Sequence, residues 1–257
     1  MWMLLLALIQ PALAHDYFLE VQPSAIAVGG KAKVYGIVAH ETERDVRGQR
    51  PDTLSRLDAS AGGTVTAVAP APALRGAPTY WGLLPATAPG VVAVAYANTG
   101  SEVSLPHERF VRYVAGEGDD RKIEVAKGLS GDQVERYRRS LKALLRVGDD
   151  TTGWDAVLGL PLELVPQSDP FARPASGELS LQLLEDGQPQ AGVKVRAFPA
   201  VGHAQAEAVT GRTDAEGKVS LAMPAREGGW VVAAVTMTHE AGREHPWHSL
   251  WTTLRLP

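Results

Sequence analysis

Residues 177–198, GELSLQLLEDGQPQAGVKVRAF, alternate apolar and polar side chains on both sides of the dipeptide Asp186-Gly187. This pattern predicts a β-hairpin with a two-residue turn, because Asp-Gly tolerates the positive φ angles that such a turn needs. The same strand-and-turn pattern recurs downstream in GRTDAEGKVSLAMP (211–224), WVVAAVTMTH (230–239) and WHSLWTTLRL (247–256). Together these segments predict a small prealbumin-like β-sandwich over residues 160–257.

The N-terminal half has the same pattern of short strands separated by turn-forming residues. FLEVQPSAIAVGGKAKVYGIVA (18–39) reads as two strands around Gly29-Gly30, and GVVAVAYANTG (90–100) reads as a later strand. These segments predict an immunoglobulin-like β-sandwich over residues 15–118. The expected fold class is therefore mostly β, with two β-sandwich domains joined by one α-helix.

The joining helix is expected within a linker over residues 119–159, in the segment LSGDQVERYRRSLKALLRVGDD (129–150). Ser130 and Gln133 have the spacing of a capping box, and Gly148 is placed to end the helix. One apolar stripe recurs at helical spacing and consists of Val134, Tyr137, Leu141, Leu144 and Leu145. The basic residues between them are expected to form a solvated face: Arg136, Arg138, Arg139, Lys142 and Arg146.

The first 14 residues are almost wholly apolar and end in Ala12-Leu13-Ala14, a small-x-small cleavage site. We expect residues 1–14 to be a signal peptide, so that the mature chain is exported and periplasmic in a Gram-negative host. No later apolar run reaches membrane-spanning length, and we expect no membrane span in the mature chain. A net charge of -4 gives no electrostatic reason to expect nucleic acid as a partner.

Cleavage after Ala14 would make His15 the first residue, with an α-amine and a ring nitrogen that can chelate one metal ion. Further imidazoles gather in the segment HEAGREHPWH (239–248), which contains His239, His245 and His248. Strand parity predicts that His239 and His248 share one face of the last hairpin, near each other across the strand pair. The candidate metal ligands are therefore His15, His239, His245 and His248, for nickel or cobalt, with copper as an alternative.

A family resemblance runs through most of the chain. It is carried by AHDYFLE (14–20), SLKALLRVG (140–148), GLPLELVPQSDPF (159–171), LLEDGQPQAGVKVRAF (183–198), GRTDAEGKVSL (211–221) and HSLWTTLRL (248–256). In these segments the chain resembles a bacterial domain-of-unknown-function family, family 4198, described as exported and NikM-like and linked with nickel or cobalt uptake. The resemblance implies an accessory protein that captures or delivers the metal for a membrane transporter.

Motifs for catalysis are missing. Each histidine that precedes a glutamate lacks the second histidine of a zinc-protease helix, and the sequence has no nucleophile elbow, P-loop or dinucleotide fingerprint. Cysteine is absent, which excludes thiol catalysis. We therefore expect no enzyme, although a copper redox enzyme with an N-terminal histidine brace remains an alternative.

A non-catalytic interaction or carbohydrate-binding module is the other alternative, because β-sandwiches commonly serve as such modules. In that case exposed tryptophans would stack on sugars, and the candidates are Trp81, Trp154, Trp230, Trp247 and Trp251. We expect at least three of these five side chains to be buried instead.

Overall fold

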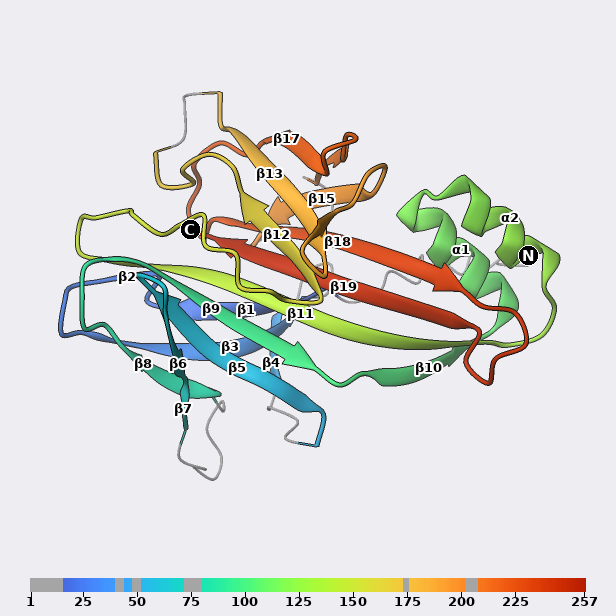
Figure 1. Cartoon of the computed structure of the whole chain (residues 1–257), viewed down its shortest axis with the longest axis horizontal. Coiled ribbons are helices and arrows are strands. Elements are labelled where there is room, and N and C mark those ends of the chain that lie inside the picture. The colour runs from blue at the N-terminus through green and yellow to red at the C-terminus, as the bar shows by residue number, and fades with distance from the viewer. Residues whose placement is uncertain (1–15, 40–43, 48–51, 72–79, 173–175, 202–207) are drawn as a thin grey trace, which may run out of the picture.

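The computed structural model describes residues 16–39, 44–47, 52–71, 80–172, 176–201 and 208–257. The chain is mostly β, as predicted, and its described strands form three sheets with two short helices at one end (Figure 1). The predicted signal peptide and His15 lie outside the described residues.

A central sheet of ten strands runs through the molecule. Its strands, in order of pairing, are β16 (Val209–Arg212), β15 (Lys194–Pro199), β18 (Trp230–His239), β19 (Trp247–Leu256), β11 (Gln133–Val147), β9 (Gly90–Asn98), β5 (Leu54–Ala61) and β6 (Thr64–Ala67). Two further strands, β10 (Ser101–Leu105) and β2 (Ala25–Ile26), also pair with β11. Strand β11 pairs antiparallel with β9 and parallel with β19, and so joins the N-terminal and C-terminal parts of the chain.

The central sheet is covered on both faces. One face packs against a sheet of β1 (Asp16–Gln22), β3 (Lys31–Ala39), β8 (Gly82–Pro85), β7 (Ala69–Pro70) and β4 (Arg44–Arg47). The other face packs against a sheet of β12 (Leu162–Pro166), β13 (Glu178–Glu185), β14 (Gln188–Pro189) and β17 (Lys218–Ala222). The two sandwiches therefore share their middle layer, which is why β9 is buried along its whole length.

The predicted Asp-Gly turn and the predicted last strand pair of the C-terminal half are confirmed, but the strand after the turn pairs with β13 only over Gln188–Pro189, and β15 joins the central sheet instead. Asp186 and Gly187 connect β13 to β14 with φ angles of 46° and 78°, the positive values that the turn requires. The last two strands, β18 and β19, pair antiparallel from Trp230–Leu256 to His239–Trp247, within the segments that were expected to be strands.

The helix predicted over residues 130–148 is wrong, because this segment forms the 15-residue strand β11. The side chains that fitted a helical stripe alternate between two faces of the central sheet. From Leu141 to Leu145 both faces are buried, so apolar and polar residues do not alternate with the two-residue period of a strand. Lys142 breaks the apolar run although it too is buried, since it pairs with Glu163.

The two helices of the described structure lie just before this strand. They are α1 (His107–Glu117), which ends at Gly118 with a φ of 73°, and α2 (Asp120–Gly128), whose N-cap Asp119 accepts a hydrogen bond from the backbone N–H of Lys122. Both pack beside the ends of β18 and β19, around the buried rings of Phe110 and Trp247 (Figure 1). No helix of the described residues is long and apolar enough to cross a membrane.

Candidate functional site

The candidate site lies at the end of the central sheet where β18, β19, β11 and β10 extend past the sheet of β12, β13 and β17 (Figure 1). Here the two faces of the sheet differ. One face is covered by α1 and α2 and encloses a buried polar network, whereas the other face is open and basic.

The covered face holds the buried carboxylate of Glu135. Its Oε1 accepts hydrogen bonds from the hydroxyl of Tyr113, at 2.9 Å, and from the hydroxyl of Ser249. Trp251 donates its indole N–H to the Ser249 hydroxyl at 2.9 Å, and its ring stacks on Tyr113. Burial raises the pKa of Glu135, and it raises the pKa of Tyr113 well above its ordinary value, with the nearby Glu135 charge adding to the effect.

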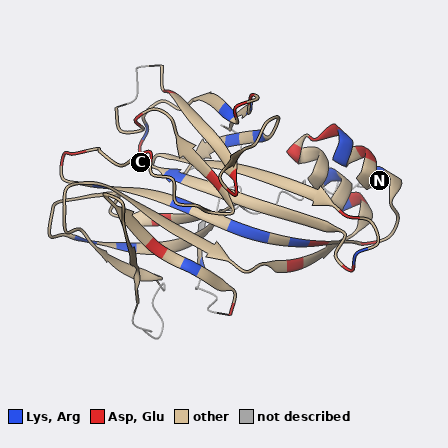
Figure 2. Cartoon of the chain, viewed as in Figure 1, with Lys and Arg blue, Asp and Glu red and all other residues tan. Residues whose placement is uncertain are grey.

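The open face is built from two rows of residues that lie side by side across the strands. The row nearer the hairpin tip contains Thr238, His248, Arg136 and Glu102, and the next row contains Thr236, Leu250 and Arg138. Residues in register on neighbouring strands point to the same face, so these side chains all project from one surface of the sheet. The basic residues of β11 are visible in Figure 2.

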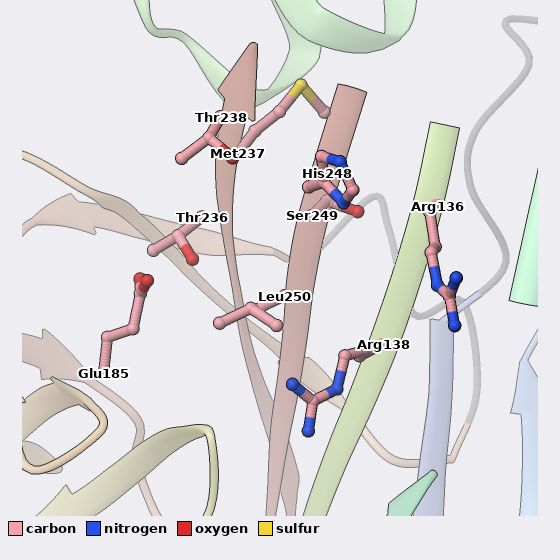
Figure 3. A pocket seen from close by; sticks show the side chains of 9 residues that line it. All are labelled: Arg136, Arg138, Glu185, Thr236, Met237, Thr238, His248, Ser249 and Leu250. Atoms are coloured by element: carbon pink, nitrogen blue, oxygen red, sulfur yellow. The ribbon is translucent and has the colours of Figure 1, made fainter. Parts of the chain in front are cut away.

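A cleft of about 360 Å³ lies over these rows. It is lined by Arg136, Arg138, Glu185, Thr236, Met237, Thr238, His248, Ser249 and Leu250. Figure 3 shows Glu185 on the opposite side of the cleft from the two arginines, with Leu250 and Thr236 between them. The cleft therefore has a basic wall, an acidic wall and a floor of methyl and hydroxyl groups.

The predicted proximity of His239 and His248 is wrong. His239 is in register with Trp247, and His248 is in register with Thr238, so the two imidazoles project from opposite faces of the hairpin. The connecting loop, residues 240–246, has an odd number of residues, so odd-numbered residues lie opposite odd-numbered ones and even opposite even. His239 contacts the ring of Trp247, with ring centroids 4.5 Å apart, whereas His248 lines the open cleft.

His245 lies in the loop between these two strands and contacts β10. Its Nε2 is 3.2 Å from Oε1 of Glu102, and its buried Nδ1 has no hydrogen-bond partner among the described residues. The described residues bring no group of three histidine, aspartate or glutamate side chains together for a metal ion. His15, the fourth predicted ligand, lies outside them.

Sequence reasoning missed the functional potential of Arg136 and Arg138, because it assigned them to the solvated face of a helix. Their two-residue spacing is the signal of a shared strand face, but the buried stretch that follows obscures that period. Of the five candidate tryptophans, three are buried as expected, namely Trp81, Trp230 and Trp247. Trp154 and Trp251 are half-buried.

The fold and this site define a β-sandwich protein with a shared central sheet and a polar cleft at one end. Residues 12–238 match the model of the family described as domain of unknown function DUF4198. The chain belongs to this family. Comparison with curated proteins finds no match, and comparison with solved structures finds none.

Proposed function

We propose that the mature chain is an exported, non-catalytic metal-binding accessory protein that captures nickel or cobalt, with copper as an alternative, for delivery to a membrane transporter. Three features support this proposal. They are the expected exposure of the His15 amine by signal cleavage, the resemblance to NikM-like proteins linked with nickel and cobalt uptake, and the arrangement of His245 at the hairpin tip.

The arrangement of His245 carries the proposal. The Glu102 carboxylate lies 3.2 Å from Nε2 of His245 and would repel a lone pair on that nitrogen, so we assign the proton of the neutral ring to Nε2. The lone pair is then on Nδ1, the nitrogen that has no partner among the described residues. A carboxylate that orients a histidine in this way is the usual support of a metal-ligating imidazole.

His248 is a poor ligand for a cation in this arrangement. It lies beside Arg136 and shares the cleft with Arg138, and two nearby guanidinium groups oppose the approach of a metal ion. We therefore assign the metal to His245, with the His15 amine and ring as the further donors. Imidazole and amine nitrogens suit nickel, cobalt and copper.

The test is a titration of the mature chain, with the His15 terminus verified by mass spectrometry, against nickel, cobalt, copper and zinc by calorimetry. We expect stoichiometric binding that weakens about 10- to 100-fold in His245→Ala and in Glu102→Gln, since loss of the orienting carboxylate typically has an effect of this size. His15→Ala should weaken it as well.

His248→Asn provides a matched control, because it removes a neighbouring imidazole that has no part in the proposed ligand set. It should leave metal affinity unchanged. Absence of binding tighter than micromolar for all four metals, or equal loss in His248→Asn and His245→Ala, would contradict the proposal.

A further inference from the structure

The basic wall of the cleft consists of two arginines that form no ion pair with a described residue, and Glu102, which lies across from Arg136 on β10, contacts His245 instead. Arg136 and Arg138 are exposed residues of β11, two positions apart, and both line the cleft with His248. No ion pair or hydrogen bond of either guanidinium group is seen with any described residue. Two guanidinium groups held beside an imidazole on one face create a positive potential that favours an anion.

The basic side chains of a neighbouring hollow, in contrast, have described partners. A second hollow, of about 250 Å³, continues from the cleft across β18 and shares Glu185, Thr236, Met237 and Thr238 with it. Its cations are occupied: Lys194 donates to the carbonyl of Gly116, Arg212 donates to the carbonyls of Gly192 and Gly118, and Lys122 pairs with Asp119. These contacts fix the C-terminal end of α1, whereas Arg136 and Arg138 contact no hydrogen-bond acceptor among the described residues.

The opposite wall carries the reverse charge. Glu185 is the last residue of β13, and Figure 3 shows its carboxylate facing the cleft from the side away from the arginines. The arginine strand β11 and the threonine strand β18 are separated by one strand, which places their backbones about 10 Å apart. This span and the cleft volume suit a small molecule rather than a polymer.

We infer that this cleft binds a small zwitterionic ligand, with an oxyanion group on Arg136, Arg138 and His248 and a cationic group toward Glu185. Guanidinium groups match carboxylate and phosphate oxygens through paired N–H donors. The Thr236 and Thr238 hydroxyls line the path between the two ends, and Leu250 contacts the carbon skeleton. Glu185 repels a ligand that is anionic at both ends, so it selects among anions of similar size.

The test compares three probes by NMR titration of the full chain: 4-aminobutyrate, glutarate and inorganic phosphate. 4-Aminobutyrate and glutarate have similar lengths but differ in the charge of the second end. We expect 4-aminobutyrate to bind more tightly than glutarate and to shift the resonances of Thr236, Thr238 and His248. Arginine-dependent shifts with phosphate would support the oxyanion site and show that a phosphate group can occupy it.

Three variants test the two walls. Arg138→Gln should weaken 4-aminobutyrate binding about tenfold or more, since a hydrogen bond to a charged group is lost. Arg136→Gln with Arg138→Gln should abolish binding of all three probes. Glu185→Gln should remove the preference of 4-aminobutyrate over glutarate, which a merely structural role of Glu185 would not do.

Arg109→Gln, an exposed arginine of α1 that does not line the cleft, is the matched control for loss of one positive charge. Thermal unfolding of each variant reports whether the fold is retained. Binding that persists in the double arginine variant, equal affinity of the wild-type chain for 4-aminobutyrate and glutarate, or no binding of any probe would overturn the inference. The proposed metal donors are different residues, so its failure leaves the metal proposal standing.

Discussion

Lys142 of β11 and Glu163 of β12 form an ion pair in the interior, with Nζ 2.8 Å from Oε1 and both side chains 1% exposed. Lys142 also donates to the carbonyl of Ala156 at 2.5 Å, and Glu163 accepts the backbone N–H groups of Leu158 and Leu160. The pair therefore ties the central sheet to the sheet of β12 and fixes the loop between β11 and β12. Burial lowers the pKa of Lys142, and the Glu163 charge opposes this effect.

Glu163→Gln should destabilise the chain by about 3–5 kcal/mol, because it leaves the Lys142 ammonium buried without a compensating charge. Lys142→Met should have a similar effect through the stranded Glu163 carboxylate. Replacing both residues, Lys142→Met with Glu163→Gln, should restore part of the loss, since no buried charge remains. Urea unfolding followed by circular dichroism measures each free energy.

The exposed pair of Lys127 and Glu124, at 2.9 Å, is the control for this prediction. Lys127→Met should change the free energy of unfolding by less than about 1 kcal/mol, because solvent screens an exposed ion pair. Equal effects of Glu163→Gln and Lys127→Met would contradict the structural role assigned to the buried pair.

Glu135 should make the stability depend on pH. Because burial raises its pKa above 4.5, the folded chain binds this proton more tightly than the unfolded chain. The resulting stabilisation is fully present below pH 4.5 and is lost as the pH rises through the folded-state pKa. Wild type should therefore lose stability relative to Glu135→Gln as the pH rises above 4.5, measured by urea unfolding at each pH.

Glu124→Gln serves as the control, because Glu124 is exposed and its replacement should leave the pH profile parallel to that of the wild type. A wild-type stability that rises relative to Glu135→Gln over the same interval would mean that the carboxylate is favoured in its charged form. The assignment of burial as the dominant influence on Glu135 would then fail.

The Asp-Gly turn and the last strand pair could be predicted from the sequence because their signals are local. Asp186-Gly187 selects its turn by backbone conformation, and β18 and β19 flank a polar loop. Strand β11 could not be predicted in this way, because its pattern depends on what covers it. The sheet of β12 hides Lys142, while nothing described covers Arg136 and Arg138, so one strand shows two different patterns.

The candidate site was only partly predictable for the same reason. The sequence indicated His245 as a candidate ligand because three histidines lie within ten residues. The structure adds its contact with Glu102, a residue 143 positions earlier in the chain. Pairing between β10 and β11 and between β11 and β19 creates that proximity. Such long-range register is not visible in a local sequence pattern.

Gly36→Ala should destabilise the chain by about 1–3 kcal/mol through overpacking. A Cβ atom at Gly36 would overlap the ring of Trp81, which is buried and donates its indole N–H to the carbonyl of Arg47 at 2.8 Å. The ring has to move, so near-ultraviolet circular dichroism and tryptophan fluorescence should change together with the free energy of unfolding.

Gly116→Ala is the matched control for that substitution, because Gly116 lies within α1 and a Cβ atom there would meet no neighbouring atom. It should stabilise the chain by up to about 1 kcal/mol, since alanine favours the helix. A neutral effect of Gly36→Ala on both stability and the tryptophan spectra would show that the Trp81 ring does not pack against this backbone.

Arg255 and Glu20 join the first described strand to the last, and this pair yields the final prediction. The guanidinium group of Arg255 contacts both carboxylate oxygens of Glu20, at 3.0 and 3.1 Å, and also donates to the carbonyls of Gly228 and Leu256. Lysine has a single ammonium group and cannot reproduce this planar set of donors. Arg255→Lys should therefore lower the free energy of unfolding by about 2–4 kcal/mol, measured by urea unfolding, although it keeps the charge, because the buried pair loses its geometry and leaves acceptors unsatisfied.

The control is Arg243→Lys, which alters the exposed pair with Glu240 and should lower the free energy of unfolding by less than about 1 kcal/mol. If the two lysine substitutions had equal effects, charge alone would explain the contribution of Arg255 and the bidentate contact would not.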